Sequence, residues 1–309
     1  MTPAASSFTS PPLSFAEILR RTRSRLNESR PLVVMGCVGI VLGLICVAVM
    51  MARGGRPIPP EGDLTKAASF DAAIGIYAIT LALLLPSSGF SEKGRRRWMW
   101  WQIALMVYSY TIETVQIFRG VDPRFSHVAT PVEQLLGLVF FLVALNVMVL
   151  FLILAASFFK RGRPDAGSPL LLAIRYACVA AIGGFAAGIW MSVINSRHTG
   201  VSGNILPLHA LSFHGLQALP AVALLLTWAG TATDETRKWV HITGIAWLIA
   251  CAAVAWQTIE GRSIFEVSPA IMVSVFVLIV WAACALFAFW RWARVPIPRE
   301  SPGISRMPT

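Results

Sequence analysis

Charged residues are scarce in this sequence, where they make up 13% of the 309 amino acids. A soluble domain contains about 25% charged residues, so the composition excludes a chain that is solvated mainly by water. The five cysteines lie inside apolar runs, and none has the CxxC or CxxCH spacing of a zinc ribbon or a covalently attached haem. No phosphate-binding glycine loop, nucleotide motif or nucleophile elbow is present, which argues against soluble-style ATP-driven or serine-hydrolase chemistry.

Long apolar runs are what the sequence has in abundance. Hydrophobic residues make up 56% of the chain, and a helix needs about 20 apolar residues to cross the hydrocarbon core of a bilayer. Eight such runs lie at approximately 32–51, 67–86, 98–118, 132–159, 169–194, 207–229, 239–259 and 268–290. We therefore predict an all-α polytopic membrane helix bundle with about eight transmembrane helices in residues 32–290, in contact with the lipid bilayer.

Polar, basic segments flank these runs. The first apolar run is too long and begins too late for a cleaved signal peptide, so we predict a basic cytoplasmic tail at 1–31 followed by a retained signal anchor. Within this tail, FAEILRRTRSRL is either a short interfacial helix on anionic lipid or part of a disordered tail. A second cytoplasmic tail, at 291–309, is rich in proline and serine, and we predict that it is disordered.

The net charge of +11 would suit nucleic acid, but the basic residues occur in short clusters between apolar runs. That pattern is typical of membrane orientation, so we predict no nucleic-acid partner. If the chain crosses the membrane at each run, 18 of the 26 lysines and arginines lie on one side and 7 on the other, with Arg175 inside a run. We therefore predict that both termini are cytoplasmic and that the membrane is the plasma membrane, as in a bacterial cytoplasmic membrane.

Ionisable side chains within the runs gather at one depth in this orientation. All three carboxylates, Asp71, Glu113 and Glu260, fall in the outer half, with Glu113 about 8 Å and His214 about 10 Å below the outer boundary at a rise of 1.5 Å per residue. Such groups are costly to expose to lipid and should face the bundle interior. We predict an outward-facing intramembrane pocket of histidine and carboxylate residues.

Two helices supply most of this pocket. In LPLHALSFHGLQALP, His209, His214 and Gln217 share one broad helical face, and Pro220 predicts a kink beside it. In the third run, Gln102, Ser109, Glu113 and Gln116 lie within one narrow arc. Interhelical hydrogen bonding is the alternative role for these polar side chains.

The residue types allow several ligands. Imidazole and carboxylate together suit a transition metal, with candidate ligands Asp71, Glu113, His209 and His214. Haem would need His209 or His214 together with His127 or His198, and Glu113 and His214 are a candidate acid–base pair. Candidate residues for binding a small molecule or ion from the extracytoplasmic side are Gln116, Arg119, Arg124, Gln217, Gln257 and Glu260.

Two other functions compete with this binding or catalytic site. Asp71, Glu113 and the histidines would serve as a relay in a proton- or cation-coupled transporter, although the cytoplasmic half contains no carboxylate within a run. A structural or assembly protein with a satisfied polar core is the third alternative. Neither the substrate nor the cellular process can be read from these residues.

Two segments carry a family resemblance. IETVQIFRGVDPRFSHVATP together with LPLHALSFHGLQALP resembles the paired signature of a family of bacterial multi-pass membrane proteins with no assigned activity. This resemblance implies that the region of Glu113 and the sixth-run histidines work together. YTIETVQ and WQTIEGR also end the third and seventh runs, as in a 4+4 duplication, but with three matching letters we interpret that similarity as coincidence.

The orientation leads to a labelling prediction. Cysteines introduced at Ser126 and Ser202 should react with impermeant thiol reagents applied to intact cells, and a cysteine at Ser91 should not, because only the first two positions are predicted to lie outside. Mass-tag labelling measures this, and the opposite pattern would invert every depth assigned above.

Overall fold

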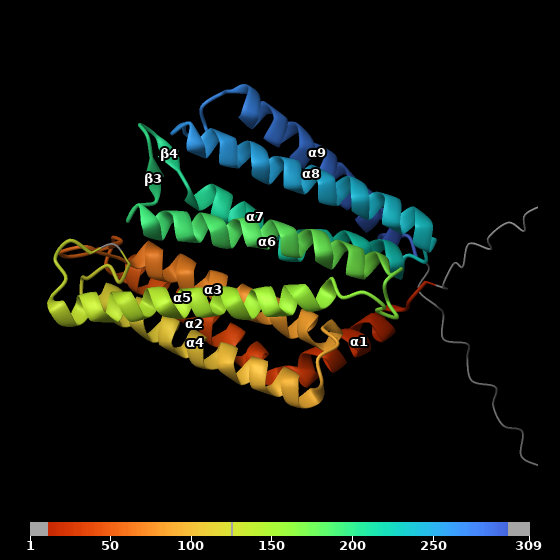
Figure 1. Cartoon of the computed structure of the whole chain (residues 1–309), viewed down its shortest axis with the longest axis horizontal. Coiled ribbons are helices and arrows are strands. Elements are labelled where there is room, and N and C mark those ends of the chain that lie inside the picture. The colour runs from red at the N-terminus through yellow and green to blue at the C-terminus, as the bar shows by residue number, and fades with distance from the viewer. Residues whose placement is uncertain (1–11, 125, 296–309) are drawn as a thin grey trace, which may run out of the picture.

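The computed structural model describes residues 12–124 and 126–295, which fold into an all-α bundle with two small hairpins (Figure 1). The helices are α1 (Phe15–Glu28), α2 (Arg30–Ala52), α3 (Leu64–Leu84), the 3-10 helix η1 (Leu85–Ser87), α4 (Glu92–Phe118), α5 (Pro131–Phe158), α6 (Pro169–Val193), α7 (Leu206–Trp228), α8 (Thr233–Ile259) and α9 (Pro269–Ala293). The antiparallel hairpins are β1 (Pro57–Ile58) with β2 (Gly62–Asp63), and β3 (His198–Thr199) with β4 (Gly203–Asn204). The predicted fold class is confirmed.

Seven of the described helices are long and apolar enough to cross a membrane, namely α2, α3 with η1, and α5 to α9. The chain is thus a multi-pass membrane protein. The predicted third span, 98–118, lies within α4, which is not one of the seven. Its length of 27 residues suffices, but Gln102, Glu113 and Gln116 make it less apolar than its neighbours. The polar stripe of α4 therefore lowers its hydropathy below that of the seven candidate spans.

The two predicted tails have different outcomes. Residues 15–28 form α1, with Ile18 buried and Phe15 and Leu19 exposed. This segment is therefore helical, as in the first of its two sequence interpretations. Whether α1 lies on lipid stays a prediction. At the other terminus α9 continues to Ala293, and 296–309 lie outside the described residues. The predicted disorder of 291–309 is therefore not tested over most of its length.

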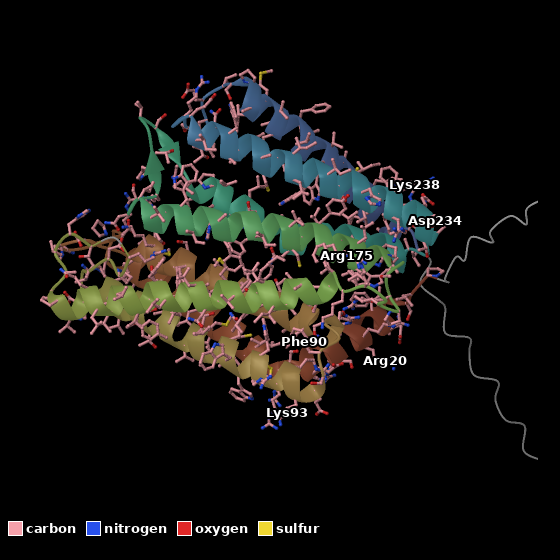
Figure 2. The ribbon with its side chains drawn as sticks, in the orientation of Figure 1. Arg20, Phe90, Lys93, Arg175, Asp234 and Lys238 are labelled. Carbon is pink, nitrogen blue, oxygen red and sulfur yellow. The ribbon has the colours of Figure 1, made fainter. Side chains whose placement is uncertain are left out.

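The bundle has two distinct ends. Both hairpins, the α4–α5 loop (described at residues 119–124 and 126–130) and the α8–α9 loop (residues 260–268) are at one end, which we call the hairpin end (Figure 1). The opposite, terminal end carries α1 and the other interhelical connections. Arg20, Lys93 and Lys238 all lie there (Figure 2). Basic clusters from distant parts of the sequence therefore gather at one end, as the predicted orientation requires.

The helices form two halves that repeat one another. Helices α2 to α5 pack together, as do α6 to α9, and α5 and α6 meet between the halves (Figure 1). The first residues of β1 and β3, of β2 and β4, and of α4 and α8 are each 141 positions apart. We call the first half the first repeat and the second half the second repeat. Because each begins at the same end of the bundle, they are parallel repeats.

Backbone hydrogen bonds and φ angles recur at the same spacing of 141 residues. The amide of Leu64 donates to the carbonyl of Arg56 at 2.9 Å, and Ile205 donates to Arg197 at 2.8 Å. Left-handed residues also recur, at Gly120 (φ +81°) and Gly261 (φ +70°). Conformation and hydrogen bonding therefore repeat even where the side chains differ.

The short similarity between YTIETVQ and WQTIEGR is coincidental, as interpreted from the sequence, although the two halves do repeat in structure. Equivalent elements are 141 positions apart, whereas Glu113 and Glu260 are 147 positions apart, so the shared letters T-I-E are not structurally equivalent. The equivalent pair is Gln116 and Gln257, four residues before Gly120 and Gly261. The repeat is therefore evident in the backbone geometry but hardly detectable in the amino-acid sequence.

The repeats diverge after these glycines. Thr130 and Ser268 cap α5 and α9 and are 138 positions apart, so the α4–α5 loop is three residues longer than the α8–α9 loop. The longer loop carries the acidic and basic residues Asp122 and Arg124. The charges of the two loops are also placed differently, because Arg124 pairs with a fully buried carboxylate, whereas Arg262 and Glu266 of the shorter loop pair near the surface.

Gly120 offers a test of this loop geometry. Its φ is in the left-handed region, and an added Cβ would overlap the carbonyl group of Pro59. Gly120→Ala should lower the free energy of unfolding by about 1 to 3 kcal/mol, measured by thermal unfolding in detergent. Gly167→Ala, where a Cβ would meet nothing within 4 Å, is the matched control. Equal effects of the two substitutions would contradict this assignment.

Candidate functional site

The polar stripe of α4 points into the protein. Gln102, Ser109, Glu113 and Gln116 are all buried, and on α3 Asp71 is fully buried as well. The sequence spacing therefore predicted the inward face of α4. Glu113 and Asp71 are the two ionisable groups on this face, and they lie close enough to interact electrostatically.

Glu113 is paired with a residue of the longer loop. Its Oε1 accepts a hydrogen bond from Nη2 of Arg124 at 2.6 Å, and the Glu113 side chain is 0% exposed while that of Arg124 is 29% exposed. The Arg124 guanidinium also lies 5.1 Å from the ring centre of Phe70 on α3. The loop thus sends its arginine inward over an aromatic ring to reach a buried carboxylate.

Asp122 fixes the loop that carries Arg124. One carboxylate oxygen accepts the backbone N–H of Arg124 at 2.9 Å, and the other accepts a hydrogen bond from Nζ of Lys66 at 2.6 Å. Burial opposes ionisation, but the hydrogen bonds from Lys66 and from the Arg124 backbone outweigh it and hold the pKa of Asp122 below its ordinary value. An ionised Asp122 therefore ties the loop to α3.

The tip of the first hairpin closes over the loop. Glu61 accepts hydrogen bonds from the Ser126 hydroxyl at 2.6 Å and from the His127 backbone N–H at 2.8 Å. Arg119 bonds Gln116 at 2.8 Å and Glu133 at 2.9 Å. Gln116 and Arg119, two candidate binding residues, therefore make contacts within the protein that join α4 to α5.

Three atoms of the site lack a protein partner. Asp71 accepts a hydrogen bond from the Thr114 hydroxyl at 2.9 Å through Oδ2. Its Oδ1, Oε2 of Glu113 and Nε of Arg124 are buried and have no hydrogen-bond partner among the described residues. Buried polar atoms are nearly always hydrogen-bonded. These three groups form a cluster with unused hydrogen-bonding capacity, which we call the acid site (Asp71, Glu113 and Arg124).

The acid site and the neighbouring pair of Asp122 and Lys66 contain more acids than bases. The acids are Asp71, Glu113 and Asp122, and the bases are Lys66 and Arg124. Three carboxylates against two cations leave one negative charge if all five groups are ionised. An uncompensated charge away from water is costly, so the arrangement favours the uptake of one positive charge.

Neither intramembrane histidine contacts the acid site directly through a hydrogen bond among the described residues. Nδ1 of His209 is 2.8 Å from the carbonyl oxygen of Gly184, which can only accept, so Nδ1 carries the proton. His209 is thereby tied to α6, and its ring packs on Phe213. His214 is on an exposed face of α7, whereas Glu113 is fully buried and bonded to Arg124. The predicted acid–base pair of Glu113 and His214 is therefore not brought together.

The predicted metal ligands are divided in the same way. Asp71 and Glu113 belong to the acid site, whereas His209 and His214 do not. Within the described ranges, no group of three or more His, Cys, Asp and Glu residues could hold a metal ion. For haem, His127 lies in the α4–α5 loop and His198 is exposed on β3 beside Arg197. The candidate metal ligands are separated because His209 and His214 belong to the second repeat and Asp71 and Glu113 to the first.

The remaining candidate binding residues hold the fold together. Gln217 donates to the Thr80 hydroxyl at 2.8 Å, which joins the two repeats. Gln257 donates to the carbonyls of Ser263 and Glu266 at 2.8 and 3.0 Å and closes the α8–α9 loop. Glu260 accepts from Trp256 on the exposed surface. These three residues do not join the acid site.

Four residues of the site were missed by sequence reasoning: Lys66, Phe70, Thr114 and Asp122. Asp122 had a detectable signal, because Gly-Val-Asp-Pro-Arg predicts a turn in which an aspartate accepts the backbone N–H two residues ahead. Lys66, Phe70 and Thr114 are 43 to 56 positions from their partners, so only the packing of α3 against α4 and its loop reveals them.

Comparison with known proteins adds no relative. No family model, curated protein or solved structure matches this chain. The resemblance to a bacterial membrane-protein family therefore stays an expectation, and the function has to be argued from the geometry.

Acid should loosen the loop through Asp122. Because its pKa lies below the ordinary value of about 3.8, the stabilisation is present above that value and is lost as the pH falls through the lower, folded-state pKa. Amide hydrogen exchange of residues 119–130 should therefore accelerate below about pH 4 in the wild type. Asp122→Asn should already exchange faster at pH 7 and respond less to acid. Asp165→Asn at the terminal end is the control. An acid response at the Arg124 amide, which donates to Asp122, that survives unchanged in Asp122→Asn would contradict the assignment.

Proposed function

We propose that this protein is a multi-pass protein of the plasma membrane, as in a bacterial cytoplasmic membrane, with both termini cytoplasmic. Its function in this proposal is to bind a small, positively charged species at the acid site from the extracytoplasmic side. The observation that supports it is the pair of fully buried carboxylates, Asp71 and Glu113, each with one oxygen that has no hydrogen-bond partner among the described residues.

The charge balance supports a cation or a proton over an anion. Arg124 neutralises Glu113 at 2.6 Å, but the partner of Asp71 is a neutral hydroxyl, that of Thr114. A single positive charge bound between Asp71 and Glu113 would complete the neutralisation. Carboxylate oxygens are also the ligands that hard cations prefer. The transition-metal and haem alternatives have less support, because the imidazoles lie outside the acid site.

The α4–α5 loop supports entry from the hairpin end. Arg124 is the only side chain of the acid site with substantial exposure, 29%, and the loop that carries it is held by hydrogen bonds from Lys66 and to Glu61. Movement of this loop would withdraw Arg124 and open a route to both carboxylates. The loop is therefore proposed as the gate of the site.

Coupled transport is the second candidate, and the parallel repeats favour it. In many transporters the site lies where two repeats can move against one another. Here Gln217 and Thr80 meet across the repeats at 2.8 Å. Gln102 on α4 has both side-chain amide atoms buried, with no hydrogen-bond partner in the part of the chain that the structure describes. These polar groups would extend a path from the acid site toward the terminal end.

Cation-dependent unfolding tests the binding proposal. Protein in detergent is titrated with Na⁺, Li⁺ or K⁺ at constant ionic strength with choline, and thermal unfolding is recorded by tryptophan fluorescence. One cation should stabilise the wild type by about 2.7 kcal/mol at 100 times its Kd. Asp71→Asn should abolish this effect, because the amide can still accept from Thr114 but supplies no charge.

The proton alternative is tested in the same preparation. If the bound species is a proton, no metal cation should stabilise the protein, and wild type and Asp71→Asn should differ by one proton in a pH titration. Asp165→Asn is the matched control for both measurements. Identical cation responses and identical proton uptake in wild type and Asp71→Asn would overturn the proposal. A measurement of proton or cation uptake into proteoliposomes distinguishes a transporter from a protein that only binds the ion.

A further inference from the structure

The two repeats share a hydrophobic core in the middle of the bundle and toward its terminal end. This core contains residues of both repeats, and those from α3, α5, α6 and α7 lie in the middle or the terminal half of their helices, for example Leu81, Phe158, Leu171 and Leu219. Residues 159–168 join α5 to α6 at the terminal end, and the two helices diverge from there toward the hairpin end (Figure 1). The shared core therefore belongs to the terminal part of the bundle.

Hydrogen bonds fasten the repeats together at the same end. Arg175 on α6 donates to the carbonyl oxygen of Phe158 at 2.9 Å, and the amide of Leu13, just before α1, donates to the carbonyl oxygen of Trp228 at 3.1 Å. Phe158 and Trp228 are the last residues of α5 and α7, and carbonyls at a helix C-terminus have no partner within the helix. Separating the repeats at the terminal end would therefore leave these acceptors without their donors.

At the hairpin end each repeat has a core of its own. The core of the first repeat consists of Cys46, Leu64, Ala67 and Ile117, and that of the second consists of Ala187, Ile205, Leu208 and Val254. Three members of each core are equivalent at the spacing of 141, because Cys46 corresponds to Ala187, Leu64 to Ile205 and Ala67 to Leu208. Burial of apolar surface is the main stabilising contribution to folding, so each repeat stabilises its own hairpin end.

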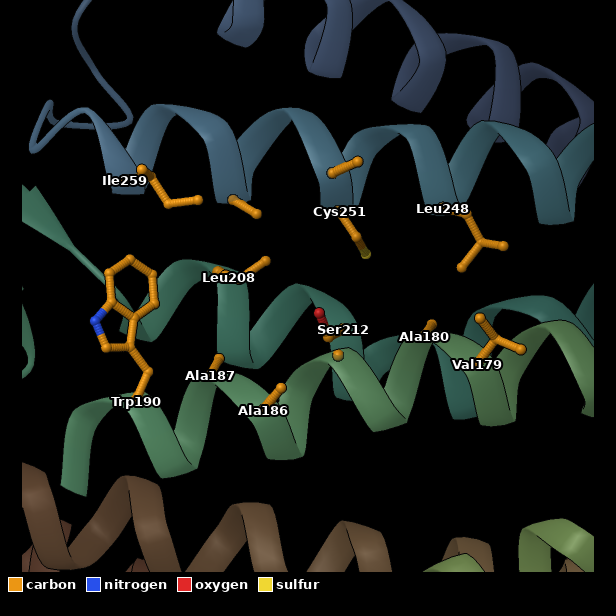
Figure 3. Close-up of a pocket in the computed structure, with 13 residues that line it drawn as sticks. Val179, Ala180, Ala186, Ala187, Trp190, Leu208, Ser212, Leu248, Cys251 and Ile259 are labelled. Atoms are coloured by element: carbon orange, nitrogen blue, oxygen red, sulfur yellow. The ribbon is translucent and has the colours of Figure 1, made fainter. Parts of the chain in front are cut away.

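A groove beside the second of these cores is not the space between the repeats. It has a volume of about 380 Å³ and lies between α6 and α8, with Ala187 and Leu208 in its lining (Figure 3). Val179 and Ile259, which also line it, are 46% and 67% exposed. The groove therefore opens on the outer surface of the second repeat.

Aromatic side chains fill the space between the repeats above the shared core. We call them the aromatic layer, which consists of Tyr77 on α3, Phe151 on α5, Phe185 on α6 and Phe213 on α7. Two ring pairs cross between the repeats, with centres 6.2 Å apart for Tyr77 and Phe213 and 5.2 Å apart for Phe151 and Phe185. Phe213 is one helical turn nearer the hairpin end than Gln217. The aromatic layer thus closes the space on the hairpin side of the hydrogen bond between Gln217 and Thr80.

Polar groups lie on both sides of the aromatic layer. On the hairpin side, the ring centre of His209 is 4.9 Å from that of Phe213, and His209 is close enough to Arg124 to interact electrostatically. Arg124 therefore lies on the side of the first repeat that faces the second. The Tyr77 hydroxyl and Oε1 of Gln217 are buried and have no hydrogen-bond partner in the described part of the chain. Buried polar atoms are nearly always hydrogen-bonded, and water would reach both atoms if the repeats separated at the hairpin end.

We propose that the two repeats hinge about the terminal end and separate at the hairpin end, which opens the aromatic layer and makes Arg124 accessible from the extracytoplasmic side. As control of access to the acid site, the hinge rests on the proposed function, whereas the motion itself does not. A small rotation suffices. Helix α5 has 28 residues and is about 40 Å long, so a rotation of about 10° around its terminal end moves its hairpin end by about 7 Å.

Distances between spin labels test the hinge. In a background in which the exposed Cys37 is replaced by alanine, nitroxides are attached to Val132→Cys and Val193→Cys, at the hairpin ends of α5 and α6, where the native residues are 68% and 75% exposed. Double electron–electron resonance on the full chain in nanodiscs should show two populations, separated by about 5 to 10 Å. The control pair Lys93→Cys and Lys238→Cys, at the terminal end (Figure 2), should show one narrow population. A single narrow population at the hairpin end, or equal widths for the two pairs, would overturn the hinge.

Substitutions in the space between the repeats should shift the two populations. Phe213→Ala removes ring contacts of the aromatic layer, and the population with the longer distance should rise about two- to tenfold, the range that corresponds to one aromatic pair. Gln217→Leu removes the hydrogen bond to Thr80 and should act in the same direction, which keeps the test decisive if Phe213→Ala fails to fold. Phe276→Ala, at a residue that is 66% exposed on α9, is the matched control. Unchanged populations in both Phe213→Ala and Gln217→Leu would overturn the proposed closure.

A cross-link distinguishes the hinge from cation binding. Val132→Cys and Val193→Cys are joined by a bismaleimide that matches the shorter measured distance, and the titration with Na⁺, Li⁺ and K⁺ is repeated. The linked protein should lose the cation-dependent stabilisation, and the same type of link between Lys93→Cys and Lys238→Cys should leave it unchanged. A response that persists in the hairpin-linked protein would overturn the hinge as the route to the acid site and leave cation binding intact. If the unlinked protein shows neither a cation response nor proton uptake, the proposed function fails, and the spin-label distances still decide the hinge.

Discussion

A carboxylate among membrane-spanning helices must be neutralised, and this constraint organises the first repeat. Glu113 is fully buried on α4 and is reached by Arg124 from outside the helix. To deliver that arginine, the α4–α5 loop turns inward, where Asp122, Lys66 and the hairpin residue Glu61 hold it. The inward turn of the loop and its contacts with α3 and the first hairpin thus serve to place one arginine beside one buried acid.

The second repeat has the same backbone as the first but no buried acid at the equivalent position. The second repeat keeps the hairpin, the left-handed glycine and the helix lengths, but valine occupies the position equivalent to Glu113. Without a buried acid there is no need for an inward arginine, and its loop is three residues shorter. One backbone thus supports a polar site in one repeat and an open apolar groove in the other.

Helix-level features were readable from the sequence because they depend on local periodicity. Runs of about 20 apolar residues identified the spans, and the polar stripe of α4 was placed on the inward face by its spacing. The pairing of side chains was not readable. His214 has the residue type of a site residue, yet it lies on an exposed face of α7, because hydropathy records depth in the membrane but not rotation about the helix axis.

By itself, the sequence determined the all-α membrane bundle, the approximate limits of its spans, and the candidate acids Asp71 and Glu113 together with Arg124. Only the tertiary structure decided that these three groups meet while the histidines do not, that Lys66 and Asp122 complete the cluster, and that the chain is a parallel duplication. The physical reason is that burial in lipid is set by composition over one helix. Charge pairing and interhelical space depend instead on contacts between segments that packing alone brings together.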